Sequence, residues 1–255
     1  MEIKVLIATH KKVELPQDSI YLPIHVGKEN KEDFGYIGDN SGENISYKND
    51  YYSELSAIYW AWKNLNSDFV GLVHYRRFFA KSRTLFWKKE PLSSEDIIAL
   101  CEKHDLILPN KRRYYIENLY SHYANTHDIS HLEKTREIIE ASSPEYLFSF
   151  DKVLKRKSAH MFNMFIMRKA LFDDYCEWLF SILFQLEKQI DLTKLSKFDA
   201  RLIGRVSELL LDVWVDKNQF QYKEVGLLEI GSRFWLKLRK FLAAKFLKRK
   251  YKQSS

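Results

Sequence analysis

The feature that most constrains the fold is the short apolar run 69–73, which ends in His74, Tyr75, Arg76 and Arg77. The run contains two valines and a glycine and lies between polar residues, so it predicts a buried β-strand rather than a helix. In open α/β sheets, ligands bind beyond the carboxyl ends of the strands, and the planar guanidinium of arginine suits phosphate oxygens. We therefore expect a diphosphate or another anion at Arg76 and Arg77. The alternative is a surface arginine pair that only caps the strand.

The residues before this strand follow the order of a βαβ unit. Residues 4–9 predict a first strand, the polar stretch 27–50 predicts a long loop, and residues 51–64 predict an amphipathic helix that leads into the strand at 69–73. A helix that connects two strands in this way usually joins parallel neighbours. We therefore predict an α/β fold with a mostly parallel central sheet flanked by helices.

The periodicity of the remaining chain predicts more elements of the same kind. They are a helix from Ser93 or Ser94 to residue 103, a strand at 105–108, a helix that is introduced at 125–128 and runs to about 141, a strand at 161–167, and helices at 169–190 and 200–214. The 255 residues, 45% of them hydrophobic, are enough for one large domain with a substantial core. Two distant cysteines in helix-like surroundings indicate buried thiols in a reducing compartment.

The net charge of +7 is concentrated at the C-terminal end of the chain. From residue 231 onward there are nine basic residues and no acidic residue, whereas residues 1–230 hold 32 basic and 34 acidic residues. A nucleic-acid-binding domain would spread its basic residues over a folded face. The sequence therefore argues against a nucleic-acid partner.

Residues 232–253 have the pattern of a basic amphipathic helix, with Phe234, Leu238, Phe241 and Leu242 on one face. Such a helix is expected to lie on an anionic membrane surface, and a solvated basic tail is the alternative. We divide the chain into a domain at 1–228 and a membrane-associating tail at 229–255. No run of about 18 apolar residues and no signal-peptide pattern is present. We expect a cytoplasmic protein that is peripheral on the inner face of the cell membrane.

The order of strand, loop, helix and strand fits a nucleotide-sugar transferase of the GT-A type, although one feature of that fold is missing. In GT-A enzymes the strand at this position normally ends in an Asp-x-Asp pair that holds a divalent metal against the diphosphate, and this chain contains no Asp-x-Asp. Fixed guanidiniums can neutralise a leaving diphosphate in place of a Lewis-acidic metal. We therefore predict metal-independent stabilisation of the leaving group and no cofactor.

Seven short segments carry a resemblance to a known family. They are Thr-His-Lys at 9–11, Asn-Ile-Ser at 44–46, Lys-Asn at 48–49, Ser-Glu-Leu-Ser at 53–56, Tyr-Trp-Ala-Trp-Lys-Asn at 59–64, His-Tyr-Arg-Arg-Phe at 74–78 and Phe-Asn-Met-Phe-Ile at 162–166. Together they make the chain similar to the DUF4422 family of bacterial capsular and exopolysaccharide glycosyltransferases, from about residue 5 to residue 214. Ser53 departs from the family pattern, because many relatives are expected to have a cysteine there.

The resemblance also implies a reaction. Known or presumed activities of the family include transfer of galactosyl or galactofuranosyl groups from UDP-sugars to lipid-linked oligosaccharides. It therefore implies a UDP-sugar donor and a polyprenol-linked oligosaccharide acceptor. Which sugar is moved, and whether its configuration is inverted or retained, stays open. Homodimerisation is possible, but nothing in the sequence demands it.

The resemblance places the donor beside three groups of residues. Those that would border the nucleotide are Thr9, His10, Lys11 and Tyr75. Polar groups on the same rim that could read uracil or ribose are Asp39, Asn44, Ser46 and Asn49. Arg76 and Arg77 would hold the diphosphate, and His74 would lie beside it.

The acceptor side is assigned to Asn163, which could bind a sugar hydroxyl, and to His127 and Asp199 as polar cleft residues. If the enzyme inverts, a carboxylate must take a proton from the acceptor hydroxyl. Glu208 lies among apolar residues of a predicted helix, where burial would raise its pKa toward a useful range. Asp199, just before that helix, is the other candidate. The alternative for Glu208 is a solvated glutamate on the helix surface.

Other functional classes fit the sequence less well. His127 and His131 have a spacing compatible with zinc on a predicted helix, but no third ligand is evident, so we predict no metal site. A non-enzymatic membrane-surface scaffold would explain the tail but not a buried strand that ends in two arginines. A nucleotide or phosphate hydrolase is disfavoured because the chain lacks a P-loop, an Asp-x-Asp cluster and a Ser/His/Asp order.

Overall fold

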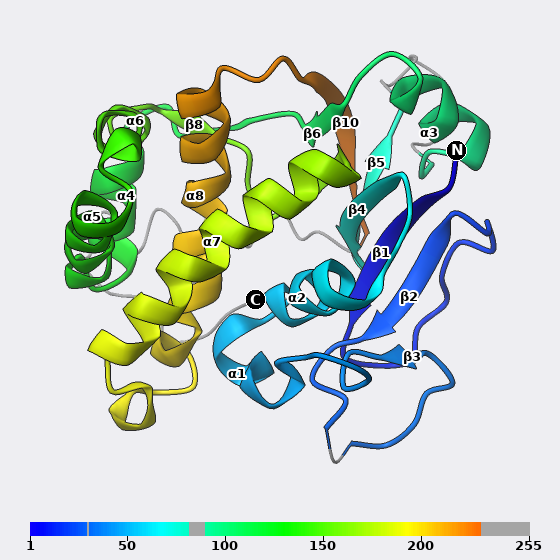
Figure 1. Cartoon of the computed structure of the whole chain (residues 1–255), viewed down its shortest axis with the longest axis horizontal. Helices are drawn as coiled ribbons and strands as arrows, with labels where there is room; N and C mark the ends of the chain where they lie inside the picture. Colours follow the sequence, from blue (N-terminus) through cyan, green and yellow to red (C-terminus); the bar gives the residue numbers. More distant parts are fainter. Residues whose placement is uncertain (30, 82–89, 231–255) are drawn as a thin grey trace.

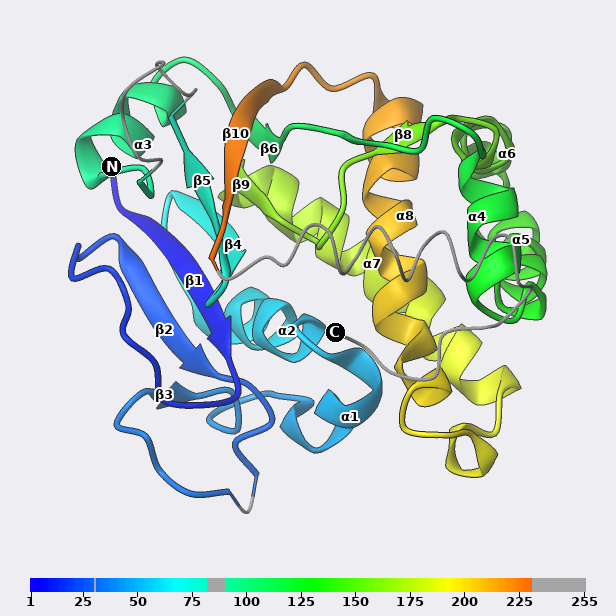
Figure 2. The same cartoon turned by 180° about the vertical axis from the view of Figure 1, so that it is seen from behind.

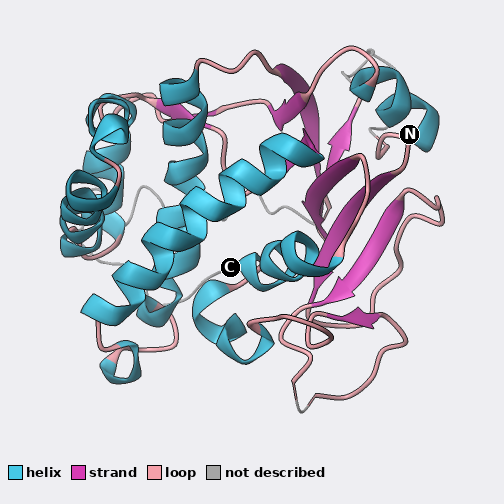
Figure 3. Ribbon diagram, in the orientation of Figure 1, coloured by secondary structure: helices cyan, strands magenta, loops and turns pink. Residues whose placement is uncertain are grey.

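The computed structural model describes residues 1–29, 31–81 and 90–230. The amphipathic helix predicted at 232–253 lies outside these residues. The described chain has most of its strands at one end of the molecule and most of its helices at the other, as the colouring by secondary structure in Figure 3 shows. Helices α7 and α8 lie between the sheet and an outer layer made of α4, α5 and α6 (Figures 1 and 2).

The bounds of the elements are as follows. The strands are β1 (Ile3–Thr9), β2 (Tyr21–His25), β3 (Ile37–Gly38), β4 (Phe69–His74), β5 (Arg77–Ala80), β6 (Leu106–Pro109), β7 (Arg112–Arg113), β8 (Ser158–Ala159), β9 (Phe165–Arg168) and β10 (Lys223–Glu229). The α-helices of the described part are α1 (Asn49–Tyr52), α2 (Leu55–Asn64), α3 (Ser94–Cys101), α4 (Leu119–Thr126), α5 (Ser130–Ser142), α6 (Leu147–Leu154), α7 (Lys169–Gln189) and α8 (Leu202–Asn218). The 3₁₀ helices are η1 (Ser46–Lys48), η2 (Pro144–Tyr146), η3 (Leu192–Lys194) and η4 (Asp199–Arg201).

Eight strands form one mixed sheet in the order β3-β2-β1-β4-β5-β10-β6-β9, and β7 pairs with β8 separately. Its N-terminal part is parallel, as the sequence predicted, with β1 between β2 and β4. The prediction of a mostly parallel sheet is wrong, because four of the eight pairings between the described strands of this sheet are antiparallel. The mixed sheet with helices packed against it is an α/β architecture.

The antiparallel pairings depend partly on β5 and β10, which the sequence did not predict. After β4 the chain turns back at once, so that His74 pairs with Arg77. Two intervening residues allow an antiparallel neighbour but not the long crossover that a parallel neighbour needs. β10 then returns after α8 and places Glu229 opposite Arg77. Because β9 pairs with both β4 and β6, a closed circuit of pairings is formed by five strands, β4, β5, β10, β6 and β9.

The single helix predicted at 51–64 is in fact two helices, α1 and α2. Between them Ser53 has a φ of 53°, in the left-handed region that few residues other than glycine adopt. Gly204 of α8 lies against this break, and a Cβ built on Gly204 would be 3.4 Å from the Ser53 side chain. α8 therefore passes close to the start of α2, where Glu54 lies.

The apolar stripes predicted for the two long helices are buried. Leu179 and Leu183 of α7 and Leu210 of α8 are fully inaccessible to solvent. Tyr175 of α7 packs against Trp214 of α8, with ring centroids 5.2 Å apart. Full burial of one such large apolar side chain contributes about 1.5–3 kcal/mol to stability. These contacts give α8 a fixed position opposite the sheet, and α8 carries one wall of the site described next.

Candidate active site

The turn at Phe162 and Asn163 lies between β8 and β9 and is hydrogen-bonded to the carboxyl end of β4 and to α8. Both residues of this turn have positive φ angles, 76° and 53°. Left-handed backbone costs about 1–2 kcal/mol for a residue with a side chain. Such strain persists where surrounding contacts fix it, and it is concentrated at functional sites.

The contacts that fix the turn come from three elements far apart in the sequence. Nε2 of His74, at the end of β4, lies 2.7 Å from the carbonyl oxygen of Phe162. The backbone N–H of Phe162 donates to Oε2 of Glu208 on α8 at 3.2 Å. Nδ2 of Asn163 donates to Oε1 of Glu54 at 2.8 Å. The structure thus brings together three residues predicted from the sequence, His74, Asn163 and Glu208, and adds Glu54.

Glu54 was missed as a site residue. In the sequence it looks like an acid at the positive end of a helix, a position that explains it without any partner. In the structure it bonds to Asn163, and its charge acts on both His74 and Glu208. The one signal that could have found it is the Ser-Glu-Leu-Ser segment at 53–56, which belongs to the family resemblance.

The half-buried Glu208 carboxyl has the pKa of a group that exchanges protons near neutral pH. Burial first, and then the charge of Glu54, raise its pKa to about 7, against the opposing effects of the Phe162 N–H and the cations Arg77 and Arg112. A carboxyl with a pKa close to the working pH can serve as a general base or acid. The rise that the sequence predicted from burial is therefore present.

The imidazole of His74 has its pKa lowered, chiefly by burial and also by the charges of Arg77 and Arg201, although Glu54 and the Phe162 carbonyl oppose this. A carbonyl oxygen can only accept, so the proton of the neutral ring is on Nε2. Nδ1 is then an acceptor. His74 can therefore receive a hydrogen bond from a hydroxyl group.

Four cations lie around His10 at the carboxyl end of β1. Burial lowers the pKa of His10, and the charges of Lys11, Arg76, Lys31 and Arg201 lower it further, in that order. The positive potential that depresses the pKa of the imidazole would attract an anion. We call Lys11, Lys31, Arg76 and Arg201 the cation cluster.

The ring of Tyr75 supports two members of this cluster. Nζ of Lys11 lies 5.3 Å from the Tyr75 ring centroid, and Cζ of Arg76 lies 5.0 Å from it. His10 packs edge-on against the same ring at 5.3 Å. Lys11 and Arg76 are exposed, and neither forms an ion pair within the described residues. Their charges are therefore available to a ligand.

Arg77 is placed differently from Arg76, although both were predicted to hold a diphosphate. Its Nε donates to Oε1 of Glu229 on β10 at 3.1 Å, and its Cζ lies 4.0 Å from the ring centroid of Phe162. Arg77 therefore packs against Phe162 of the turn, and its positive charge acts on the carboxyl of Glu208. Of the two arginines, Arg76 is exposed at the cation cluster and Arg77 is already bound to a carboxylate.

Part of the predicted nucleotide-reading rim is occupied by its own hydrogen bonds. Asp39 is fully buried and accepts from the backbone N–H groups of Gly27 and Lys28 at 2.8 and 3.1 Å. The hydroxyl of Ser46, also buried, donates to Asp39. These two residues fix the shape of the loop between β2 and η1, and their polar atoms face that loop.

Two further members of the rim are also engaged internally. The Thr9 hydroxyl donates to the carbonyl of Lys11 at 2.7 Å, which fixes the turn that carries Lys11 of the cation cluster. Nδ2 of Asn49 donates to the carbonyl of Ser53 at 2.7 Å and so supports the break between α1 and α2. Both residues shape the site through the backbone.

The aromatic side chains of Tyr123 and Phe198 lie near Glu208 and Arg205 of α8, and we call them the aromatic wall. Tyr123 is buried and lies close enough to Glu208 for its pKa to be raised by that charge, after the larger effect of burial. Cζ of Arg205 on α8 lies 4.1 Å from the ring centroid of Phe198. The charge of Arg205 is felt by Tyr123, and Arg205 in turn senses both Glu208 and Asp199. Asp199 therefore lies near this wall, and its role on the acceptor side stays a prediction.

His127 belongs to the same wall. The sequence predicted that His127 lies at the start of a helix, but no helix begins at this residue. It directly follows α4, and its ring lies 5.0 Å from Tyr123 and 5.8 Å from Phe198. The sequence did not predict α4, which starts where the side chain of Asn118 accepts from the N–H of Ser121 at 2.8 Å. The helix predicted to follow 125–128 and to run to about 141 is α5, which begins at Ser130 and ends at Ser142.

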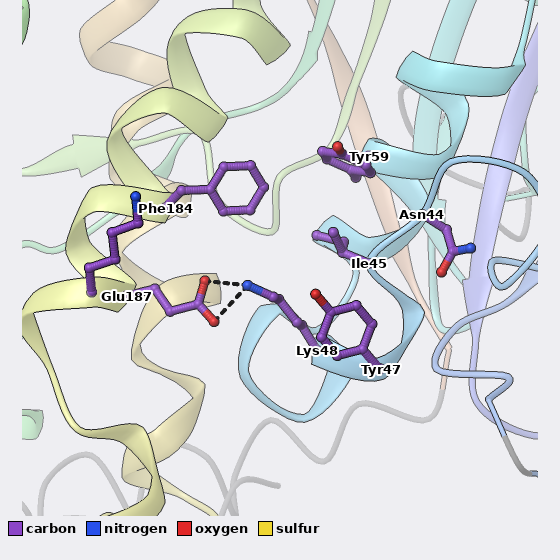
Figure 4. A pocket seen from close by; sticks show the side chains of 8 residues that line it. Asn44, Ile45, Tyr47, Lys48, Tyr59, Phe184 and Glu187 are labelled. Atoms are coloured by element: carbon purple, nitrogen blue, oxygen red, sulfur yellow. Dashed lines mark hydrogen bonds and ion pairs between the residues drawn. The ribbon is translucent and has the colours of Figure 1, made fainter.

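A separate open groove of about 620 Å³ lies between the loop at 44–48 and the end of α7 (Figure 4). Nζ of Lys48 lies at its centre and donates to the two oxygens of Glu187 at 2.7 and 2.9 Å. Glu187 also accepts from the Tyr52 hydroxyl at 2.9 Å. Asn44, predicted as a donor-site residue, lines this groove. The central charges of the groove are thus paired with each other.

Neither a metal cluster nor a membrane span is found in the described part of the chain. Within residues 1–29, 31–81 and 90–230, no group of three or more His, Cys, Asp or Glu side chains could hold a metal ion. In the same ranges, no helix is long and apolar enough to cross a membrane.

Comparison with known proteins places the chain. A family profile described as a domain of unknown function, DUF4422, matches residues 4–219. The chain belongs to the DUF4422 family. This confirms the resemblance drawn from the seven segments, and the match includes every site residue named above except Glu229. No curated protein matches the chain.

One solved structure is similar to this member of the DUF4422 family over most of its length. It is described as the apo structure of the WbbM bifunctional glycosyltransferase, with a TM-score of 0.84 and 31% sequence identity. The similarity covers 91% of this chain and 46% of the other, so this chain spans about half the length of that protein.

Proposed function

We propose that this chain is a glycosyltransferase that moves a hexose from a UDP-sugar to a hydroxyl group of a lipid-linked oligosaccharide in capsule or exopolysaccharide synthesis. Galactose and galactofuranose are the favoured sugars, from the family resemblance. The observation that carries the proposal is Glu208, a carboxyl with a pKa of about 7 that lies near the aromatic wall and accepts from the backbone N–H of Phe162. The likeness to the WbbM glycosyltransferase at 31% identity supports transferase activity.

The cleft offers the two groups that a direct displacement needs. The acceptor oxygen attacks the anomeric carbon, the bond between that carbon and the diphosphate breaks, and UDP leaves with the electron pair. Glu208 as carboxylate takes the proton of the acceptor hydroxyl. Lys11, Arg76 and Arg201 neutralise the charge that grows on UDP, in place of a metal. This reaction inverts the configuration at the anomeric carbon.

The neighbouring side chains position the reactants. Nδ1 of His74 accepts a hydrogen bond from a hydroxyl of the transferred sugar, while Asn163 and Glu54 hold the turn against α8. His127 and Asp199 lie on the acceptor side of Glu208. Because the acceptor is anchored in a membrane, we also propose that the protein works at the inner face of the cell membrane, with residues 232–253 as one contact.

A non-enzymatic scaffold is less well supported, because a binding surface has no use for a carboxyl whose pKa is raised to about 7. The two are separated by release of UDP from UDP-sugars, measured with and without a lipid-linked oligosaccharide. We expect acceptor-dependent release by the wild-type chain, and loss of that release in Glu208→Gln with UDP binding retained. UDP binding without acceptor-dependent release from any UDP-hexose would contradict the proposal.

A further inference from the structure

A group of exposed apolar side chains lies at the start of α4. Tyr115 is 80% exposed, Ile116 is 64% exposed and Tyr120 is 42% exposed. Large apolar side chains scattered singly over a surface need no explanation, but a contiguous group marks an interaction surface. Three such residues within six positions of the chain form a group of this kind.

Basic side chains surround this group. Arg113 of β7 pairs with Ser158 of β8, and the N–H of Tyr114 donates to the carbonyl of Lys157 at 2.7 Å. The segment with Lys155 and Lys157 therefore runs beside the exposed apolar residues. Arg113, Lys155 and Lys157 are exposed, and within the described ranges none of them has a carboxylate at ion-pair distance.

The acid of the same segment turns inward. Glu117 is only 8% exposed, and its carboxylate accepts from Nδ2 of Asn125 at 2.9 Å and lies 3.1 Å from Nδ1 of His122. The outward charge of this corner of the domain is therefore positive, around an apolar centre that contains two tyrosines.

We propose that this face lies on an anionic membrane surface. It is called the membrane face below and consists of Arg113, Tyr115, Ile116, Tyr120, Lys155 and Lys157. Tyrosine prefers the boundary between lipid and water, because its ring is apolar and its hydroxyl is wet. Each basic residue near an anionic bilayer strengthens binding about fivefold. The combination of exposed apolar side chains and unpaired cations fits a lipid surface better than a polar protein partner.

The membrane face adjoins the acceptor side of the cleft. Tyr114, between Arg113 and Tyr115, is buried, and the charge of Glu208 adds to the effect of burial in raising its pKa to about 12. Contact at this face would therefore bring a lipid-linked acceptor to Glu208. Only this last step rests on the proposed function, since membrane contact itself needs neither transfer nor the predicted tail helix.

The test places a reporter in the membrane face of the full-length chain. Ile116→Cys is labelled with the environment-sensitive dye NBD, and the native Cys101 and Cys176 are both buried. Tyr47→Cys, at a position that is 69% exposed beside the groove of Figure 4, is the matched control. The probes are vesicles of phosphatidylcholine with phosphatidylglycerol, and vesicles of phosphatidylcholine alone.

We expect the dye at 116 to shift to the blue and brighten with the anionic vesicles, while the dye at 47 stays unchanged. Adding Lys155→Ala and Lys157→Ala should raise the lipid concentration for half-maximal response about 25-fold. No response at 116 overturns the proposal, whether or not another segment binds the vesicles. If the dye at 116 responds to higher protein concentration without vesicles, a second copy of the chain covers this face, and that result also overturns the proposal. Since no donor is present, either failure leaves the transferase proposal standing.

Discussion

The backbone N–H of Phe162 donates to Oε2 of Glu208 at 3.2 Å, while the carbonyl of the same residue lies 2.7 Å from Nε2 of His74. One left-handed residue thus fixes a carboxyl from α8 and an imidazole from β4, which are more than a hundred residues apart in the sequence. The positions of Glu208 and His74 relative to each other are therefore set through the backbone of Phe162.

Transfer should increase with pH through about 7, because only the carboxylate form of Glu208 can take a proton. Glu208→Gln should lower kcat by roughly 10²–10⁴-fold and leave the Kd for UDP unchanged. The measurement is kcat against pH for wild type and variant. A flat profile across neutral pH would show that another group is the base.

The same raised pKa should cost stability above neutral pH. The ordinary pKa of 4.5 applies in the unfolded chain and about 7 in the folded one. The folded state therefore binds the proton more tightly, and the free energy of unfolding falls as pH rises from 4.5 through about 7. Glu208→Gln removes this loss and should gain on the order of 3 kcal/mol over wild type at pH 8 relative to pH 4.

Urea unfolding at both pH values measures this gain. Glu137→Gln, on the exposed side of α5, is the matched control and should change the free energy of unfolding equally at the two pH values. A gain for Glu208→Gln that does not depend on pH would mean that the carboxyl titrates normally.

The two neighbouring arginines should behave differently when they are truncated. Arg76→Ala should weaken UDP binding at least about tenfold, since charge-assisted contacts to phosphate are strong, and leave the Tm unchanged because the side chain is exposed. Arg77→Ala breaks the ion pair with Glu229 and should lower the Tm. Calorimetry with UDP and thermal unfolding measure the two effects, and equal losses of UDP affinity would contradict the distinction.

Asn163 should be sensitive to both backbone and side-chain changes. Asn163→Ala removes the hydrogen bonds to Glu54 and Ser207. It also places alanine at a φ of 53°, in the left-handed region that alanine adopts only at a cost. The free energy of unfolding should therefore fall by about 2–4 kcal/mol. Asn163→Gly loses the same bonds but fits the backbone, and should be about 1 kcal/mol more stable than the alanine variant. Identical unfolding free energies for the two would show that the turn is not strained.

Substitution of His160, which lies two residues before Phe162, should strongly lower the free energy of unfolding. His160 is fully buried, with Nδ1 2.5 Å from Asp212 and Nε2 3.1 Å from Glu224. His160→Ala leaves the buried Asp212 without this partner, a change that costs about 3–5 kcal/mol. Urea unfolding should show the loss, and adding Asp212→Asn should recover part of it. No recovery in the double variant would mean that lost packing, and not charge, is responsible.

Elements with a regular apolar pattern could be predicted from the sequence. The helices at 169–190 and 200–214 were found because their apolar residues recur at one helical period over many residues, and the strand at 69–73 was found because its apolar run is short and continuous. β5 was missed because it follows β4 after a turn of only two residues. β10 was missed because the strands that it pairs with, β5 and β6, are distant in the chain. The break at Ser53 was missed because no glycine or proline announces a left-handed residue there.

The site was predictable in its residue types but not in its pairings. His74, Asn163 and Glu208 could be chosen from pattern and family resemblance. That Arg77 is held by Glu229, and Arg76 is not, depends on how β10 returns beside β5, which local sequence cannot show. Asp39 and Ser46 looked like ligand-reading groups because they are polar residues in a long loop, whereas their bonds to each other are what gives that loop its shape.

The most direct test is calorimetric titration of UDP into the full-length chain, first with EDTA and then with manganese. We predict binding with the same Kd in both conditions, and a Kd raised at least about tenfold by Arg76→Ala. Binding that requires manganese would contradict stabilisation of the diphosphate by the cation cluster. Absence of UDP binding in both conditions would contradict a UDP-sugar as the donor.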